Sequence, residues 1–150
     1  MKGWLQQRWT RKKLARIHNL HDVERLAKRA LPRPIFGYID HVAEDGRTQR
    51  ANLTAFDDYR FMPKAFVNVS QIDLHTELYG KRYAVPFGIA PMGISALSTY
   101  QGDLVLAQAA AKRNLPMIMS GSSLVPMEEV AKVEGADWFQ AYLPGTPEGI

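Results

Sequence analysis

The sequence of 150 residues contains no cysteine, so the chain can form no disulfide, no thiolate metal site and no cysteine nucleophile. A reducing compartment is therefore permitted. The sequence also has no apolar run of about 18 residues, the length that a membrane-spanning helix needs. No apolar segment of the kind found in secretory signals is present. We expect a cytoplasmic protein.

Common phosphate and metal patterns are absent too. No GxxxxGK loop occurs, and no GxGxxG follows the first expected strand, which argues against a dinucleotide-binding sheet. The four histidines (His18, His21, His41 and His75) lack the spacing of a zinc site, and none ends an expected strand. The chain therefore offers no obvious general base.

Charge is distributed unevenly over the chain. The net charge is +4, and ten of the 19 Lys and Arg residues lie within the first 33 residues, beside only two of the 15 acidic residues. Residues 1–20 form a basic arm that also carries Trp4 and Trp9. Such an arm can bind an anionic membrane surface or a nucleic acid. The alternative is a solvated helical face that packs on the rest of the protein. If the arm binds a membrane, we expect peripheral contact with the inner membrane.

Helices are expected first, and strands follow. Apolar residues recur on one face over residues 21–31, and prolines at 32 and 34 end that pattern. Shorter helices are predicted over residues 35–43 and 47–56, which would form a cap before the strands. Residues 72–86 alternate and turn at Gly80, which predicts a β-hairpin.

Apolar runs and helical segments then alternate to the end of the chain. Strands are predicted at residues 87–91, 117–119 and 138–141, with helices at 104–111 and 128–133 between them. The runs are uniformly apolar, which is typical of parallel strands buried on both faces. This pattern predicts an α/β fold, and either a barrel or a doubly wound sheet fits it.

Polar or glycine residues follow each apolar run. Pro91, Met92 and Gly93 bring backbone N–H groups to the end of the first run, and Gly93 has no Cβ to keep a flat ligand away. Ser120 and Gln140 hold equivalent places in the next two runs. Their neutral donors and acceptors suit a hydrogen-bonding ring system.

Tyr142 should lie on the same side of its strand as Gln140, because side chains alternate along a strand. Each of these groups has an ordinary structural alternative. The glycine could serve a plain turn, Ser120 a cap, Gln140 a backbone bond, and Tyr142 an interface. Their coincidence at successive strand ends favours a binding site.

The last residues predict that the chain is part of a longer one. Thr146, Pro147 and Glu148 form a typical helix start, with a capping hydroxyl, a proline and an acid. A chain that stopped there would leave the third strand with an unpaired edge. We therefore expect the N-terminal part of a longer protein.

Five ordered motifs from about residue 20 to the end resemble one family. They are LPRPIFGYIDHVAED (31–45), AFDDYRFMPKAFVNVS (55–70), PFGIAPMG (86–93), the run around Ser120, and WFQAY (138–142). The chain resembles the FMN-dependent 2-hydroxy acid dehydrogenases and oxidases, which include L-lactate and mandelate dehydrogenases. The resemblance implies that residues 21–150 are the N-terminal part of a (β/α)8 TIM barrel that binds FMN, preceded by a helical cap and a β-hairpin.

The resemblance also assigns roles to residues. It implies that the backbone of Pro91, Met92 and Gly93 faces the flavin ring, and that Ser120 and Gln140 bond the ring's polar edge. Tyr38 matches a tyrosine that binds the substrate carboxylate, and Tyr142 matches a catalytic tyrosine near the substrate oxygen. Ser122 stands where glycolate oxidase has an aromatic residue, which implies a differently shaped substrate pocket.

The family's histidine base and carboxylate-binding arginine lie in later strands, so we expect these 150 residues to be inactive alone. The resemblance implies a small L-2-hydroxy acid substrate, a homo-oligomer at full length, and oxygen, a quinone or a cytochrome as electron acceptor. Two alternatives stay open. One is a noncatalytic module whose arm contacts membrane or nucleic acid, and the other is a related flavin barrel with different chemistry.

Overall fold

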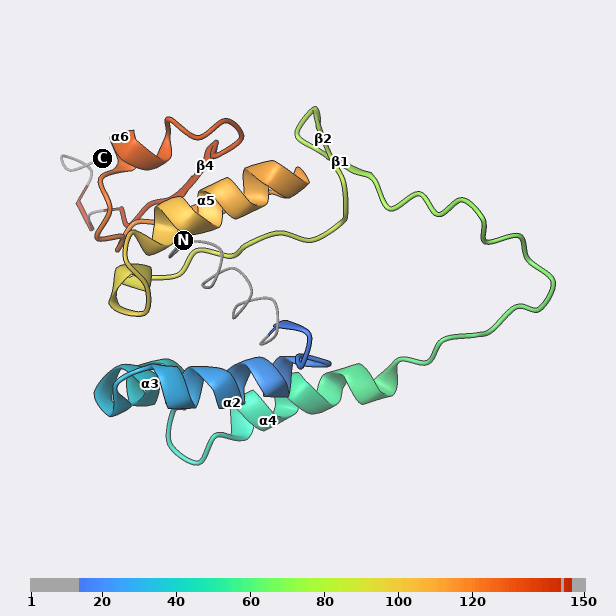
Figure 1. Ribbon diagram of the computed structural model, residues 1–150, viewed down its shortest axis with the longest axis horizontal. Helices are drawn as coiled ribbons and strands as arrows, with labels where there is room; N and C mark the ends of the chain where they lie inside the picture. Colours follow the sequence, from blue (N-terminus) through green and yellow to red (C-terminus); the bar gives the residue numbers. More distant parts are fainter. Residues whose placement is uncertain (1–13, 144, 147–150) are drawn as a thin grey trace, which may run out of the picture. The chain divides into compact units, whose positions relative to one another are not determined.

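The structure is a computed structural model that describes residues 14–143, 145 and 146. These residues fall into two compact units, one that ends at Met62 and one that begins at Pro63 (Figure 1). Each unit is described by itself. The basic arm up to Lys13 and the expected helix start at residues 147–148 lie outside the described residues.

The first unit is helical, as the sequence predicts. Its elements are α2 (Leu20–Ala30), α3 (Arg33–Asp40), α4 (Arg47–Thr54) and the 3₁₀ helix η1 (Ala55–Asp58). The three expected helices are confirmed, although α3 ends three residues before its expected limit. Pro34 in the first turn of α3 needs no N–H partner there, which explains why this helix can follow α2 so closely.

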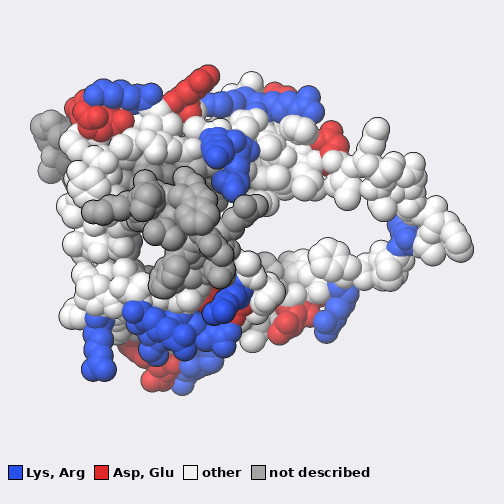
Figure 2. Space-filling view, in the orientation of Figure 1, with Lys and Arg blue, Asp and Glu red and all other residues white. Residues whose placement is uncertain are grey.

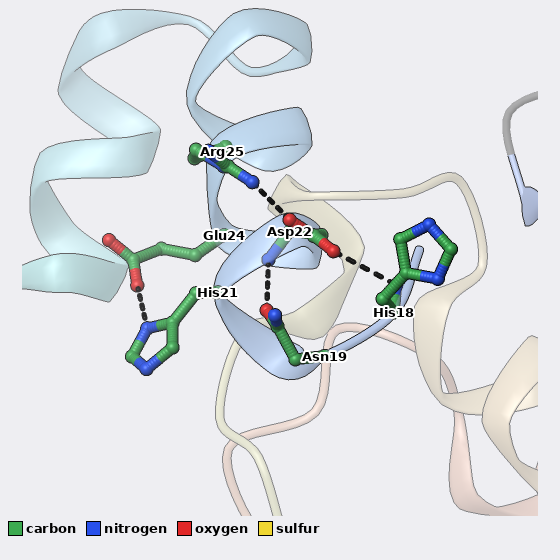
Figure 3. Close-up of polar contacts among 6 residues, drawn as sticks. All are labelled: His18, Asn19, His21, Asp22, Glu24 and Arg25. Carbon is green, nitrogen blue, oxygen red and sulfur yellow. Dashed lines mark hydrogen bonds and ion pairs between the residues drawn. The ribbon is translucent and has the colours of Figure 1, made fainter. Parts of the chain in front are cut away.

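Helix α2 begins with a set of side-chain bonds (Figure 3). The Asn19 side chain accepts from the backbone N–H of Asp22 at 3.0 Å, and the Asp22 carboxylate accepts from the N–H of His18 at 2.9 Å. Arg25 pairs with the same carboxylate, and His21 lies 3.7 Å from Glu24. The Asn19 bond satisfies an N–H group that the helix start leaves unpaired, and the Asp22 bond fixes the residue before the cap to the first turn of the helix.

Lys and Arg side chains gather on part of the surface of this unit (Figure 2). The last turn of α2 carries Lys28 and Arg29, and Figure 2 shows Lys and Arg side chains gathered over the helical unit.

The expected apolar face of α2 is only partly covered, because Leu20 is 85 % exposed while Leu26 is half-buried. No helix among the described residues is long and apolar enough to cross a membrane.

The second unit opens with the predicted hairpin. Strands β1 (Thr76–Leu78) and β2 (Lys81–Tyr83) pair antiparallel around Tyr79 and Gly80, both with positive φ (49° and 75°). That combination is typical of a two-residue hairpin turn. The Tyr83 side chain is fully buried, and its hydroxyl oxygen accepts from Nε1 of Trp138 at 3.1 Å. Lys81 pairs with Asp137, so the hairpin is fixed to the chain just before the last strand.

Two of the three expected parallel strands are present, one shifted by one residue and the other one residue shorter than expected. Strand β3 (Ile118–Ser120) pairs in parallel with β4 (Trp138–Gln140), and Ser120 stands opposite Gln140. The expected strand over 87–91 is reduced to Ile89, which bridges Met117 in parallel and bonds Pro116 and Ile118. Prolines at 86 and 91 remove ladder donors at both ends, which explains the shortening.

Helices connect these strands and cover one side of them. They are the 3₁₀ helix η2 (Ser95–Leu97), α5 (Gly102–Arg113) and α6 (Met127–Val130). The predicted helix over 128–133 is therefore shorter and begins one residue earlier. The buried core consists of small and apolar side chains from α5, β3 and α6 with their flanking loops: Ala107, Ala110, Met117, Met119, Val125 and Val130. The order strand, helix, strand, helix, strand is an α/β arrangement.

The expectation that all three strands are buried on both faces is wrong for the described residues. Phe139 of β4 is 50 % exposed, and Phe87 is 66 % exposed. The physical reason is that no described element covers the faces on which these two side chains lie. Among the described residues, β4 also has no strand partner on its outer edge, so the second unit is an open α/β layer and not a closed barrel.

Candidate functional site

The candidate site lies where the parallel strands end. Ile89, β3 and β4 run side by side in the same direction, so the residues that follow them share one edge of the sheet. This edge carries Gly93, Ser120 and Gln140, the residues that the sequence nominates. Ligands of parallel α/β folds bind at this edge, outside the carboxyl ends of the strands.

Ser120 and Gln140 lie next to one another on adjacent strands. The Ser120 side chain is 3 % exposed, and its Oγ donates to Oε1 of Gln140 at 3.4 Å, a long contact. The N–H of Gly121 donates to the same Oε1 at 3.2 Å. The N–H of Ser122 donates to Oγ of Ser120 at 3.1 Å. These contacts fix the two side chains in one orientation.

The loop that follows Ile89 packs on the loop that follows β3. The N–H of Ile94 donates to the carbonyl oxygen of Ser122 at 3.1 Å. A Cβ on Gly93 would lie 3.4 Å from Cβ of Ser122 and 3.9 Å from Oγ of Ser120, which places this glycine beside Ser120. Pro91 is half-buried, and Met92 is 46 % exposed.

The chemistry of these groups fits a flavin ring. A buried hydroxyl, a primary amide and exposed backbone at a glycine supply neutral donors and acceptors in one place. They suit a planar heterocycle with alternating carbonyl and ring nitrogen atoms. Within residues 14–143, 145 and 146, no group of three or more His, Asp or Glu side chains could hold a metal ion.

Tyr142 belongs to the same group of residues, and Tyr38 belongs to the other unit. The Tyr142 side chain is 72 % exposed, and a Cβ on Gly121 would lie 3.0 Å from its ring Cδ2. The Tyr38 side chain is 63 % exposed on α3. The structure thus brings together Gly93, Ser120, Gln140 and Tyr142, while the roles of these residues and of Tyr38 stay predictions.

Sequence reasoning missed two residues that organise this edge. Gly121 bonds Gln140 through its N–H and gives room to Tyr142. Asp103 is 1 % exposed and accepts hydrogen bonds from serines in both loops. The run of small residues SGSS (120–123) is a signal for close backbone approach that could have pointed to Gly121. An acid in the first turn of a helix is too common to have pointed to Asp103.

Comparison with known proteins identifies the family. The sequence model described as FMN-dependent dehydrogenase matches residues 27–150. The chain is 35 % identical over 128 residues to an (S)-mandelate dehydrogenase of Pseudomonas putida, which covers 85 % of this chain and 33 % of that protein. It is 36 % identical over 128 residues to an L-lactate dehydrogenase of Pseudomonas syringae pv. syringae, covering 85 % of this chain and 34 % of that protein.

Solved structures agree with these sequence matches. A soluble mutant of the membrane-associated (S)-mandelate dehydrogenase from Pseudomonas putida superposes with a TM-score of 0.81 at 36 % identity, over 85 % of this chain and 37 % of that one. A mandelate oxidase superposes with a TM-score of 0.79 at 30 % identity, over 85 % and 37 % of the two chains. The chain spans about a third of the length of the relatives it matches. With a family match that covers most of its residues, the chain belongs to the FMN-dependent dehydrogenase family.

Proposed function

We propose that this chain is the N-terminal part of an enzyme that oxidises a small, lactate-like L-2-hydroxy acid to the 2-oxo acid with FMN. FMN is the cofactor of the family, and the similar proteins are named mandelate and lactate dehydrogenases. The observation that carries the proposal is the bonded pair of Ser120 and Gln140 beside Gly93. Residues 21–150 would belong to a (β/α)8 barrel that later strands complete.

The proposed cofactor residues are those at the strand ends. The backbone of Pro91, Met92 and Gly93 would lie against the flavin ring, since a glycine permits close approach. Ser120 and Gln140 would bond the polar edge of the ring, and their contact with each other orients both before the cofactor binds. When bound, FMN accepts the electron pair from the substrate, a chemistry that no side chain of this chain can supply.

The two tyrosines are the proposed substrate residues. The Tyr142 hydroxyl would donate to the substrate's 2-oxygen and act in catalysis, and the Tyr38 hydroxyl would donate to the carboxylate. Both residues are more than half exposed, so a ligand can reach their side chains. None of the proposed cofactor and substrate residues has a side chain that could act as the general base. We therefore propose that the 150 residues alone are inactive and that the base belongs to the remainder of the full-length enzyme.

The test is to purify the full-length enzyme and add substrate without an electron acceptor. We expect a yellow protein whose flavin absorbance bleaches with L-lactate or (S)-mandelate and not with the D or (R) enantiomers. Ser120→Ala and Gln140→Leu should each weaken FMN binding by about tenfold, the effect of losing one or two hydrogen bonds. A colourless protein, or one that no 2-hydroxy acid bleaches, would refute the proposal.

A second proposal concerns location. We propose that the basic arm (residues 1–20) holds a cytoplasmic enzyme on the anionic inner surface of the membrane, where a quinone would be a convenient electron acceptor. The concentration of Lys and Arg at the start of the chain supports it, as does similarity to a protein described as membrane-associated.

Sedimentation with vesicles tests this second proposal. The full-length enzyme should sediment with anionic vesicles, less so at higher salt, and not with neutral vesicles. Deletion of residues 1–18 should abolish sedimentation and leave turnover with a soluble acceptor unchanged. Equal sedimentation with neutral vesicles, or salt-dependent binding to DNA in its place, would contradict a membrane role. Light scattering would show whether the enzyme is the expected homo-oligomer.

A further inference from the structure

Asp103 is a buried acid that the proposed catalytic groups do not include. It is the second residue of α5 and is 1 % exposed. Its Oδ2 accepts hydrogen bonds from Oγ of Ser95 at 2.7 Å and from Oγ of Ser123 at 2.8 Å. A buried carboxylate is costly unless such bonds compensate for lost hydration. These two hydrogen bonds therefore help to keep the Asp103 side chain buried.

The two serines come from the two loops that bear the proposed flavin-facing residues. Ser95 lies two residues after Gly93, and Ser123 lies three residues after Ser120. One oxygen atom of Asp103 thus joins the loop after Ile89 to the loop after β3. Asp103 belongs to α5, and this helix packs in the core through Ala107 and Ala110.

The first of these loops has a conformation that needs external support. Ile94 has a φ of 56°, in the left-handed region that β-branched residues rarely adopt. Such a conformation persists only where neighbouring contacts hold it. The bond from the N–H of Ile94 to Ser122 is one such contact, and the Ser95 bond to Asp103 is the next along the chain.

The start of α5 is shaped for close contact with Ser95. A Cβ on Gly102 would lie 2.5 Å from Oγ of Ser95 and 2.7 Å from its carbonyl carbon, so no larger residue fits without movement. An acid that only balanced the helix dipole could do so from the surface. Because Asp103 is instead buried against both loops, it also serves to hold these loops in position.

We propose that Asp103 is a positioning residue that holds the two flavin-facing loops in register, and so sets the affinity of the site for FMN. We place it outside direct contact with the ring and the substrate, so that it acts through Ser95 and Ser123. The inference rests on the proposed function, because it takes the edge beside Gly93 and Ser120 as the flavin site.

The test compares Asp103→Ala with Asp103→Asn in the full-length enzyme. FMN is removed, and its Kd is measured by fluorescence titration. Asp103→Ala should raise the Kd by about tenfold or more, because two hydrogen bonds to a carboxylate are lost. Both serines donate to the same oxygen, so an amide oxygen in its place can accept both bonds. Asp103→Asn should therefore restore the Kd to within about threefold of wild type.

Ala107→Gly is the matched control. Ala107 is buried to a similar degree in α5 and packs in the core cluster, but its methyl group can form no hydrogen bond to Ser95 or Ser123, and glycine weakens the helix. This variant should lower the Tm of the apoprotein and leave the Kd for FMN unchanged. If Asp103→Ala changes the Kd no more than Ala107→Gly does, the positioning role is refuted.

Ser95→Ala and Ser123→Ala carry the test if Asp103→Ala does not fold. Each should raise the Kd. The effects of the two serine substitutions should be non-additive in the double variant, whereas combining either one with Ala107→Gly should give additive effects. Wild-type Kd values in both serine variants would refute the inference. A wild-type enzyme that binds no FMN would instead refute the proposed function, so the two failures are distinguishable.

Discussion

The ring of Tyr142 lies against the backbone of Gly121, at a position where any side chain would collide. A Cβ on Gly121 would come within 3.0 Å of the Tyr142 ring and 2.7 Å of the carbonyl oxygen of Gln140. The carbonyl belongs to the end of β4, so it cannot yield as a flexible side chain would. Gly121 thereby connects a proposed substrate residue with a proposed cofactor residue.

We expect Gly121→Ala to disturb both residues at once. The added methyl should lower the free energy of unfolding by about 1–3 kcal/mol, as overpacking does, and should weaken FMN binding. Urea unfolding and flavin titration of the full-length enzyme measure the two effects. The control is Gly37→Ala in α3, where nothing outside the neighbouring residues and the backbone of the helix itself lies within 4 Å of the new Cβ. That variant should gain up to about 1 kcal/mol from helix propensity. A Gly121→Ala enzyme as stable as wild type would contradict the close contact.

The two proposed substrate tyrosines should differ in their kinetic signatures. Tyr142→Phe removes a hydroxyl that we place at the reacting oxygen, so kcat should fall by about a hundredfold. Tyr38→Phe removes a bond to the carboxylate in both ground and transition states, so KM should rise by about tenfold with little change in kcat. Steady-state kinetics with L-lactate and (S)-mandelate measure both.

Tyr100→Phe provides the control for this pair. Its side chain is 85 % exposed, and no role is proposed for it, so both constants should stay at wild-type values. If Tyr38→Phe and Tyr142→Phe leave turnover intact, the enzyme is a related flavin protein with different chemistry.

Local sequence patterns were sufficient to predict most secondary structure elements. Periodicity identified α2 and α5, because a helix that packs on one side repeats every three to four residues. Gly80 located the hairpin, since its turn requires positive φ. Polar residues after apolar runs located Ser120 and Gln140, because parallel strands end at one edge.

Contacts between distant residues were beyond these patterns. Gly121 meets Tyr142 across 21 positions, and Asp103 meets Ser123 across 20, so no local period records either pair. Burial of Phe139 was expected from its apolar neighbours, but burial depends on what covers a strand and not on its own composition. The first strand was overestimated because its apolar content outweighed the prolines at its ends.

The start of α2 should give the helical unit a dependence on acid. The backbone N–H of His18 and then the Arg25 side chain stabilise the Asp22 carboxylate and hold its pKa below the usual 3.8. A lowered pKa stabilises the folded state above pH 3.8, and that contribution is lost as pH falls through the folded pKa. Unfolding monitored by circular dichroism should therefore show a steeper loss of stability below pH 3.8 in wild type than in Asp22→Asn. Glu24→Gln, on the exposed side of the same turn, should follow wild type.

The ion pair between Lys81 and Asp137 should make the stability of the folded state depend on pH in the alkaline range. The hydrogen bond to Asp137 raises the pKa of Lys81 above 10.5, desolvation opposes this rise to a smaller extent, and the charge of Asp137 adds a further contribution to the rise. A raised lysine pKa stabilises the folded state below pH 10.5, and that contribution is lost as pH rises through the folded pKa. The two side chains are 41 % and 55 % exposed, so their coupling should be only about 0.2–1 kcal/mol.

A double-mutant cycle of Lys81→Met and Asp137→Asn measures this coupling directly. The coupling free energy should stabilise the folded state at neutral pH, become smaller with added salt, and vanish once Lys81 is deprotonated. Lys132 and Glu129, which pair at 2.8 Å within the α6 region, provide a matched pair three residues apart. Since Lys81 and Asp137 join the hairpin to the residue before β4, loss of their coupling should also loosen the Trp138 contact with Tyr83 and shift tryptophan fluorescence. Breaking the Lys132 pair should leave that fluorescence unchanged, and a coupling that persists at the same size well above pH 10.5 would show that the Lys81 charge is not its source.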